Sequence, residues 1–324
     1  MEYVTLGRTG LRVSRLAFGT WQLGGDWGPV DERGAIDAIR RARDVGINLF
    51  DTAQAYGFGA SERVLGRALA GELRSRRDEI VIATKGGLRR CDDGVTRDAS
   101  RASLRAGVED SLRALGVDCI DLYQVHWPDP SVPFEETAGY LRELVQAGKI
   151  RHVGVSNFDV AQIDAFSRTC PVETLQPPYH LFRRDIEREV LPYCADHAIA
   201  VLVYGPLAHG LLTGAIRSDV VFARGDWRRR SDLFRGRALE HNLDTVRVLD
   251  AIARQRGRRV GQLAIAWTLA NPAVHVAIVG SRRAAHVDDA VGALDLRLDG
   301  DDLACIDAVL AHAVAVAGPS PEMV

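Results

Sequence analysis

The sequence predicts an α/β protein with one domain, a (β/α)8 barrel of the TIM type that spans residues 1–324. Short β-branched runs alternate with longer amphipathic segments, which is typical of parallel strands joined by right-handed helical crossovers. Eight such repeats follow one another without a linker or a low-complexity run. An open doubly wound sheet usually carries a G-x-G-x-x-G turn after its first strand, whereas this chain reads Gly19-Thr20-Trp21-Gln22 there. The pattern therefore favours a closed barrel.

The strands and helices of the barrel are predicted from two periodicities. The β-branched runs are residues 16–18, 47–50, 80–83, 120–125, 153–155, 173–175, 199–203 and 276–279. Apolar residues at i, i+3, i+4 and i+7 predict the helices between these runs. We expect these helices at residues 34–45, 62–70, 99–114, 133–147, 160–168, 186–197, 239–254 and 284–293.

Three segments depart from the alternation. Residues 4–6 and 11–13 flank a glycine-bounded turn, which predicts an N-terminal β-hairpin that plugs the bottom of the barrel. Residues 213–237 form a long polar segment, rich in Arg and Asp, between the seventh strand and its helix. Residues 261–271 predict an additional helix, which Pro272 ends.

Composition excludes several classes of function. The 41 basic and 43 acidic residues give a formal net charge of −2, which argues against a nucleic-acid binder. We therefore interpret the Arg-dense stretches as solvated surface. The five cysteines are widely spaced and include no C-x-x-C pair, as expected for reduced thiols in the cytoplasm. Neither a signal peptide nor a membrane-spanning apolar run is recognisable. Nothing in the sequence indicates an oligomeric state.

Polar residues directly follow most of the predicted strands. They are Asp51, Lys85, His126, Ser156 with Asn157, Gln176 and Tyr204. In an α/β barrel the carboxyl ends of all eight strands meet at one mouth, where the chemistry takes place. We therefore expect these side chains to converge there.

Each of four candidate residues also has a purely structural interpretation. Asp51 is compatible with a turn cap, and Lys85 with a solvated loop lysine. His126 is compatible with a satisfied buried histidine, and Tyr56 with packing on the barrel rim. These interpretations are independent of one another, whereas one functional arrangement accounts for all four residues. We therefore prefer the functional interpretation.

The functional interpretation is carbonyl reduction. Hydride transfer to a carbonyl leaves an alkoxide that needs a proton, which the phenol of Tyr56 can supply. An ammonium group at Lys85 would favour the phenolate, and the carboxylate of Asp51 would balance the lysine charge in a partly dry site. A neutral His126 can donate a hydrogen bond to the carbonyl oxygen and orient the substrate.

An ordered series of motifs resembles the aldo-keto reductase superfamily along essentially the whole chain. The motifs are Asn48-Leu49-Phe50-Asp51-Thr52-Ala53, Tyr56-Gly57, Gly59-Ala60-Ser61-Glu62, Thr84-Lys85, Asp121-Leu122-Tyr123-Gln124-Val125-His126, Gly154-Val155-Ser156-Asn157-Phe158, Gln176-Pro177-Pro178-Tyr179, Tyr204-Gly205-Pro206-Leu207 and Gly210-Leu211-Leu212-Thr213-Gly214. The resemblance implies a barrel that binds NADPH, less often NADH, in extended form. It also implies that Asp51, Tyr56, Lys85 and His126 match the catalytic tetrad.

The same resemblance assigns the cofactor contacts. Ser156, Asn157 and Gln176 match the residues that hold the nicotinamide carboxamide, Tyr204 matches the ring that stacks on the nicotinamide, and backbone groups of Gly205, Pro206, Leu207, Gly210 and Leu211 lie along the pyrophosphate. Gly19, Thr20 and Trp21 are expected to border the cofactor as well. The turn Gly280-Ser281-Arg282-Arg283, followed by a helix, matches the site for the adenosine ribose and its 2′-phosphate. A helix N-terminus with arginines is independently an anion site, so we favour NADPH over NADH.

The adenine end departs from the usual pattern of these relatives. Many relatives read Gln-x-x-Glu-Asn where this chain has His286-Val287-Asp288-Asp289-Ala290. The asparagine contact with adenine is therefore missing at Ala290, and Asp289 is a shorter acid than Glu. We expect His286 to make NADPH binding depend on pH.

Aromatic residues near the strand ends predict the substrate pocket. Trp21, Tyr56, His126, Trp127, Phe158 and Trp227 are expected to line it, with Phe234 from the long polar segment. Such a wall fits aromatic or medium-chain aldehydes and ketones, although sugars also stack on Trp. A regulatory subunit of the potassium-channel β-subunit type, which binds NADPH with little turnover, is the alternative. A metal-dependent hydrolase is disfavoured because none of the nine histidines forms an H-x-H pair.

Overall fold

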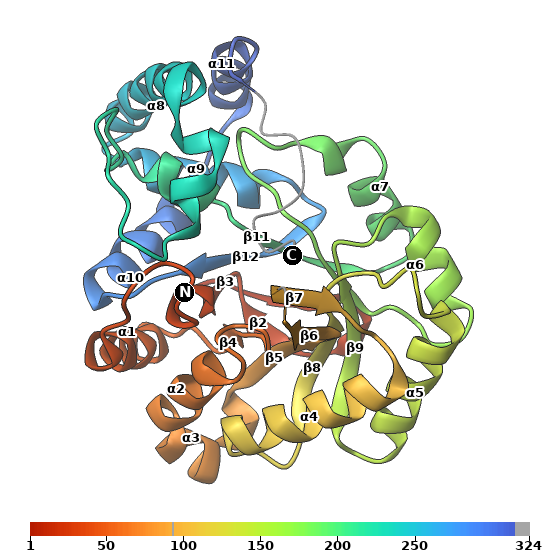
Figure 1. Cartoon of the computed structure of the whole chain (residues 1–324). Helices are drawn as coiled ribbons and strands as arrows, with labels where there is room; N and C mark the ends of the chain where they lie inside the picture. Colours follow the sequence, from red (N-terminus) through yellow and green to blue (C-terminus); the bar gives the residue numbers. More distant parts are fainter. Residues whose placement is uncertain (93, 315–324) are drawn as a thin grey trace.

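Eight parallel strands close into a barrel in the computed structural model, which describes residues 1–92 and 94–314 (Figure 1). Around the barrel the strands follow the order β10-β11-β12-β3-β4-β5-β8-β9. Their bounds are β3 (Leu16–Gly19), β4 (Leu49–Asp51), β5 (Val81–Gly86), β8 (Ile120–Val125), β9 (Ile150–Ser156), β10 (Thr174–Gln176), β11 (Ala200–Tyr204) and β12 (Val274–Gly280). The eight predicted strands are confirmed, with shifts of a few residues at their ends.

The predicted N-terminal hairpin is also present and seals the lower end of the barrel. Strands β1 (Tyr3–Thr5) and β2 (Arg12–Ser14) pair antiparallel, and Leu6 and Val13 beside them are fully buried. These two side chains pack with residues that begin strands, among them Val81 and Ala200. The interior of the barrel is therefore a packed apolar core at its amino end.

A ring of helices covers the outside of the barrel (Figure 1). The eight expected helices are α1 (Glu32–Asp44), α2 (Ala60–Ala68), α4 (Arg101–Leu115), α5 (Phe134–Gln146), α6 (Val160–Ser167), α7 (Val190–Asp196), α8 (Gly236–Gln255) and α10 (Ala284–Val291), and the additional helix is α9 (Val260–Ala270). In α1 the predicted stripe faces inward, since Ile39 and Ala42 are fully buried.

Several short elements were not predicted from the sequence. The hairpin β6 (Leu88–Cys91) and β7 (Gly94–Arg97) follows β5, and α3 (Ala70–Ser75) and α11 (Gly300–Leu310) lie on the outside. Between Thr213 and the start of α8 at Gly236, the long polar segment contains only the short 3-10 helices η6 (Trp227–Arg230) and η7 (Asp232–Phe234). None of the helices in the described part of the chain is long and apolar enough to cross a membrane.

Candidate active site

A cavity of about 350 Å³ opens at the carboxyl ends of β3, β4, β11 and β12. Thirteen residues expected to contact the cofactor line it: Gly19, Thr20, Trp21, Asp51, Tyr204, Gly205, Pro206, Leu207, Gly210, Gly280, Ser281, Arg282 and His286. Tyr56 lines the cavity as well. The predicted convergence of strand ends is therefore confirmed for this half of the barrel mouth.

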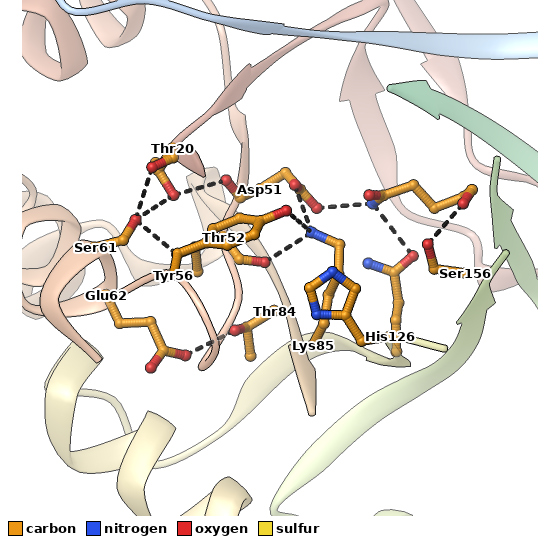
Figure 2. A network of polar contacts seen from close by, with 12 residues as sticks. Thr20, Asp51, Thr52, Tyr56, Ser61, Glu62, Thr84, Lys85, His126 and Ser156 are labelled. Carbon is orange, nitrogen blue, oxygen red and sulfur yellow. Dashed lines mark hydrogen bonds and ion pairs between the residues drawn. The ribbon is translucent and has the colours of Figure 1, made fainter. Parts of the chain in front are cut away.

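Lys85 is the centre of a buried polar cluster beside the cavity (Figure 2). Its ammonium nitrogen donates to Asp51 Oδ2 at 2.7 Å, to the Thr52 carbonyl oxygen at 2.9 Å and to the Tyr56 phenol oxygen at 3.3 Å. These bonds use all three of its donor protons. The lysine and Asp51 are both almost fully buried, so their charges are removed from water as a pair. The phenol oxygen of Tyr56 thus accepts a hydrogen bond from the lysine inside this pair's buried environment.

His126 lies next to this cluster at the end of β8. Its ring is buried, and its centroid lies 5.7 Å from that of Tyr56, at nearly a right angle. Figure 2 shows the imidazole beside Lys85. The structure therefore brings together all four residues of the predicted tetrad.

The three predicted carboxamide-binding residues join the same network. Gln176 Nε2 donates to Asp51 Oδ1 at 2.8 Å, and Ser156 Oγ donates to the Gln176 carbonyl oxygen at 2.7 Å. Asn157 Nδ2 donates to the His126 carbonyl oxygen at 3.0 Å. The backbone of Asn157 has φ of 62°, in the left-handed region that Asn tolerates better than most residues. These side chains are held in fixed orientations by residues on neighbouring strands.

The first turn of α2 makes hydrogen bonds both to the loop that carries Tyr56 and to the residue after β3. The Ser61 hydroxyl donates to Thr20 Oγ1 at 2.6 Å, and the Ser61 backbone N–H donates to the Tyr56 carbonyl oxygen at 3.2 Å. The neighbouring Glu62 accepts a hydrogen bond of 2.7 Å from the hydroxyl of Thr84, the residue before Lys85 (Figure 2). Burial raises the pKa of the Glu62 carboxyl, against the effect of this hydrogen bond.

The segment after β11 has unusual backbone geometry along the cavity wall. Gly205, Ala208, His209 and Gly210 all have positive φ, between 45° and 100°. Two of these residues are not glycine, and such conformations persist only where the surroundings hold them. Leu211, expected at the pyrophosphate, is buried and does not line the cavity.

The other end of the cavity is bordered by the first turn of α10. Ser281 Oγ accepts from the Arg283 backbone N–H at 3.1 Å. Arg283 and His286 are exposed at the cavity, whereas Arg282 is turned toward the loop after β3, where it donates to the Pro29 carbonyl oxygen at 3.1 Å. Asp289 departs from expectation, because its carboxylate faces Arg259 at 3.4 Å and does not line the cavity.

An aromatic cluster closes one side of the cavity. The rings of Trp21 and Trp227 stack with centroids 5.8 Å apart, and Trp27 meets the Trp21 ring edge-on at 5.0 Å. The Trp227 backbone N–H donates to the Asp26 carbonyl oxygen at 3.0 Å, which joins the long polar segment to the loop after β3. Phe234, buried behind this cluster, packs on the Trp227 ring at 6.0 Å.

Of the residues expected in the substrate pocket, only Trp21 and Tyr56 line the cavity; His126, Trp227 and Phe234 lie beside it without lining it, and two others lie farther out. Phe158 packs against Phe134 and Phe166 in the helical layer, with centroids 5.4 and 6.0 Å away. The left-handed turn at Asn157, just before it, accompanies this outward direction of the chain. Trp127 is buried under Arg97 and does not line the cavity.

Sequence reasoning missed several residues of the cavity wall. They are Gln22, Trp27, His209, Thr213, Arg228, Ile278 and Val279 as lining residues. His209 and Thr213 lie in or beside a recognised motif, which was a usable signal. Trp27 and Arg228 reach the cavity only because two distant loops pair at the bridge between Trp27 and Asp226. No cluster of three or more His, Cys, Asp or Glu side chains that could hold a metal ion occurs within residues 1–92 and 94–314.

Comparisons with known proteins agree with this geometry. The model of the Aldo/keto reductase family matches residues 15–311. The chain is 42% identical over 317 residues to "Aldo-keto reductase YhdN" of Bacillus subtilis (strain 168), covering 97% of this chain and 95% of the relative. It is 34% identical over 318 residues to "NADH-specific methylglyoxal reductase" of Escherichia coli (strain K12), covering 93% and 96%.

Two further relatives bear on the alternatives. A "Probable voltage-gated potassium channel subunit beta" of Arabidopsis thaliana is 35% identical over 312 residues, covering 91% of this chain and 92% of the relative. Among solved structures, the glycerol dehydrogenase AKR11B4 from Gluconobacter oxydans superposes with a TM-score of 0.86 at 39% identity, covering 96% of this chain and 95% of that one.

Proposed function

This chain belongs to the aldo/keto reductase family, and from that premise we propose that it reduces aldehydes and ketones with NADPH, using Tyr56 as the general acid. One observation carries the proposal: the Lys85 ammonium lies between the Asp51 carboxylate and the Tyr56 phenol, at 2.7 and 3.3 Å. A lysine held only for stability would not need to contact a phenol at a cavity wall. In this position its charge makes the phenol a stronger acid.

The proton transfer follows from these contacts. When bound, a reduced nicotinamide cofactor would supply a hydride to the carbonyl carbon. Tyr56 would give its proton to the oxygen that becomes an alcohol, and Lys85 would stabilise the phenolate that is left. Asp51 pairs with the lysine and holds it in place, and His126 would orient the carbonyl oxygen. In the oxidative direction the same phenolate would take the proton back.

The residues at the cavity fit an extended dinucleotide. Tyr204 and the polar network of Gln176 would hold the nicotinamide end, and the backbone from Gly205 to Gly210 would lie along the pyrophosphate. Arg283 and His286, at the first turn of α10, supply positive charge for a 2′-phosphate. This charge supports NADPH, although the Escherichia coli relative is named NADH-specific. The carboxylate of Asp289 is engaged by Arg259, so we assign it no cofactor contact.

The substrate class follows from the aromatic wall. Trp21 and Trp27 line the cavity and offer apolar surface for a small carbonyl compound, with Trp227 stacked on Trp21. All five cysteines are free thiols, which supports a cytoplasmic location. A purely regulatory role is disfavoured by the complete tetrad, although one relative is named as a channel subunit.

The test compares the wild type with Tyr56→Phe. We expect the variant to lose at least about a hundredfold in kcat because the proton donor is gone, with cofactor binding nearly unchanged. Fluorescence titration with NADPH and NADH measures binding, and absorbance of the nicotinamide with 4-nitrobenzaldehyde measures turnover. Retained turnover in Tyr56→Phe would overturn the proton-donor role. Single-turnover oxidation without a steady-state rate in the wild type would favour the regulatory role.

A further inference from the structure

The hairpin β6–β7 is inserted directly after β5, the strand that carries Lys85. Its register pairs Leu88 with Arg97, and Arg90 with Val95, so these four side chains share one face of the hairpin. Leu88 is buried, which identifies this face as the inner one. In the view of Figure 1 the hairpin lies across the middle of the ring of helices. Two arginines therefore share a face with the buried Leu88 on an insertion next to the tetrad; Arg97 is half-buried and Arg90 is exposed.

Each of these arginines lies on an aromatic ring beside the tetrad. The guanidinium carbon of Arg90 lies 4.5 Å from the centroid of the Phe58 ring, two residues after Tyr56. That of Arg97 lies 5.1 Å from the centroid of the Trp127 ring, which directly follows the tetrad histidine. The hairpin thus spans from the tyrosine loop to the histidine loop, with one guanidinium on each.

The charges of these two arginines are not neutralised by an ion pair. Neither makes a salt bridge with a carboxylate in the described part of the chain, and Arg97 donates only to the carbonyl oxygen of Pro128, at 3.1 Å. The carboxylate of Asp98 is engaged by Arg89 on the outer face of the hairpin, at 2.9 Å. That of Asp129 accepts from the backbone N–H groups of Ala99 and Ser131 and from the Ser131 hydroxyl. Although burial acts in the opposite direction, these hydrogen bonds and the nearby charge of Arg97 lower the pKa of Asp129, without an ion pair forming.

We propose that Arg90 and Arg97 recognise an anionic group, a carboxylate or a phosphate, on the carbonyl substrate. This inference rests on the proposed carbonyl reduction and names its preferred substrates. A guanidinium stacked on an aromatic ring loses little freedom on binding, and Arg97 uses only one of its N–H groups, on the Pro128 carbonyl oxygen. Carboxylate and phosphate are the groups that match the N–H edge of a guanidinium.

The test uses matched pairs of aldehydes that differ in one anionic group. Butanal against succinic semialdehyde tests a carboxylate, and glyceraldehyde against glyceraldehyde 3-phosphate tests a phosphate. We expect the wild type to show a higher kcat/KM for at least one anionic member. Arg90→Gln and Arg97→Gln should each lower this value roughly tenfold, mainly through KM, the size expected for a lost hydrogen bond to a charged group. Turnover of the neutral members should change less than about twofold.

Arg89→Gln is the matched control, because it removes the same charge from the outer face of the same hairpin. Arg90→Lys keeps a charge and should retain part of the preference. A wild-type preference for the neutral member of both pairs, or an equal loss in Arg89→Gln, would overturn the inference while the proposed function stands. Absence of turnover with all four aldehydes would reject the proposed function and the inference with it.

Discussion

The two ends of the cavity are built on opposite principles. At the tetrad end, Lys85 and Asp51 are almost fully buried, and every donor proton of the lysine is engaged. At the α10 end, Arg283 and His286 are exposed, and their charges are shared with water. The first arrangement is fixed before any ligand arrives, whereas the second can reorganise around one. We infer that proton transfer depends on the preorganised cluster at the tetrad end. Cofactor choice depends on exposed side chains at the α10 end, which can rearrange around a ligand.

The largest effect is expected from breaking the buried end. Lys85→Met removes the cation beside Tyr56, and kcat should fall about a hundredfold or more while the NADPH dissociation constant changes little. Steady-state kinetics and fluorescence titration measure the two quantities. Because Asp51 would be left buried and unpaired, Lys85→Met/Asp51→Asn is the matched control for folding. Recovery of turnover in the double variant would contradict the role of the lysine charge.

A smaller effect, limited to one cofactor, is expected at the exposed end. Arg283→Ala should weaken NADPH binding about tenfold and leave NADH binding unchanged, because it removes one partner of the 2′-phosphate. Arg41→Ala is a suitable control, since that arginine bonds Asp288 on the outer side of α10. Equal weakening of both cofactors would show that Arg283 does not contact the 2′-phosphate.

The pH dependence of NADPH binding tests the exposed α10 end of the cavity, through His286. Histidine is the side chain type whose charge changes within the physiological pH range, and His286 lines the cavity at this end. We therefore expect NADPH affinity to fall about two- to threefold between pH 6 and pH 8 in the wild type, as for one exposed charge pair, and to stay flat in His286→Ala. Fluorescence titrations at both pH values test this, and parallel behaviour of the two proteins would exclude the histidine.

The smallest effect is expected on the pH dependence of the unfolding free energy, through the buried carboxyl of Glu62. The pKa of Glu62 is raised in the folded state by burial, so the folded protein holds this proton more tightly than the unfolded chain. The contribution of Glu62 is fully present below the ordinary glutamate pKa and is lost as pH rises through the raised one. Glu62→Gln should therefore reduce the fall in unfolding free energy over this window, as measured by urea titration. An unchanged pH profile would mean that Glu62 ionises normally.

The predictability of the two ends from sequence differs for the same physical reason. Asp51, Lys85 and His126 were predicted because they directly follow buried β-branched runs, and strand direction alone brings such positions together. Trp27 and Arg228 were missed because the bridge between two loops brings them to the cavity, and no local pattern encodes it. Phe158 was expected inside but lies in the helical layer, since strand periodicity ends at the left-handed Asn157.

The elements outside the barrel also differ in how clearly a local sequence pattern encodes them. The N-terminal hairpin was predicted from two apolar runs around a glycine-bounded turn. The β6–β7 hairpin has mostly polar strands, with no apolar run on either side of its turn to mark it. The α11 helix begins at a capping box formed by Asp299 and Asp302. This local signal follows the last strand–helix repeat, so the alternation of strands and helices does not include it.

Closure of the barrel has a consequence for how the protein folds. Strand β3 pairs with β12, so Leu16 lies beside Ala277 and Gly19 beside Gly280. These contacts join segments more than 250 residues apart, which predicts slow, high-contact-order folding. During synthesis the cofactor wall at β12 emerges long after the tetrad strands have left the ribosome. A nascent chain would therefore hold its proton-transfer residues well before it could bind a dinucleotide.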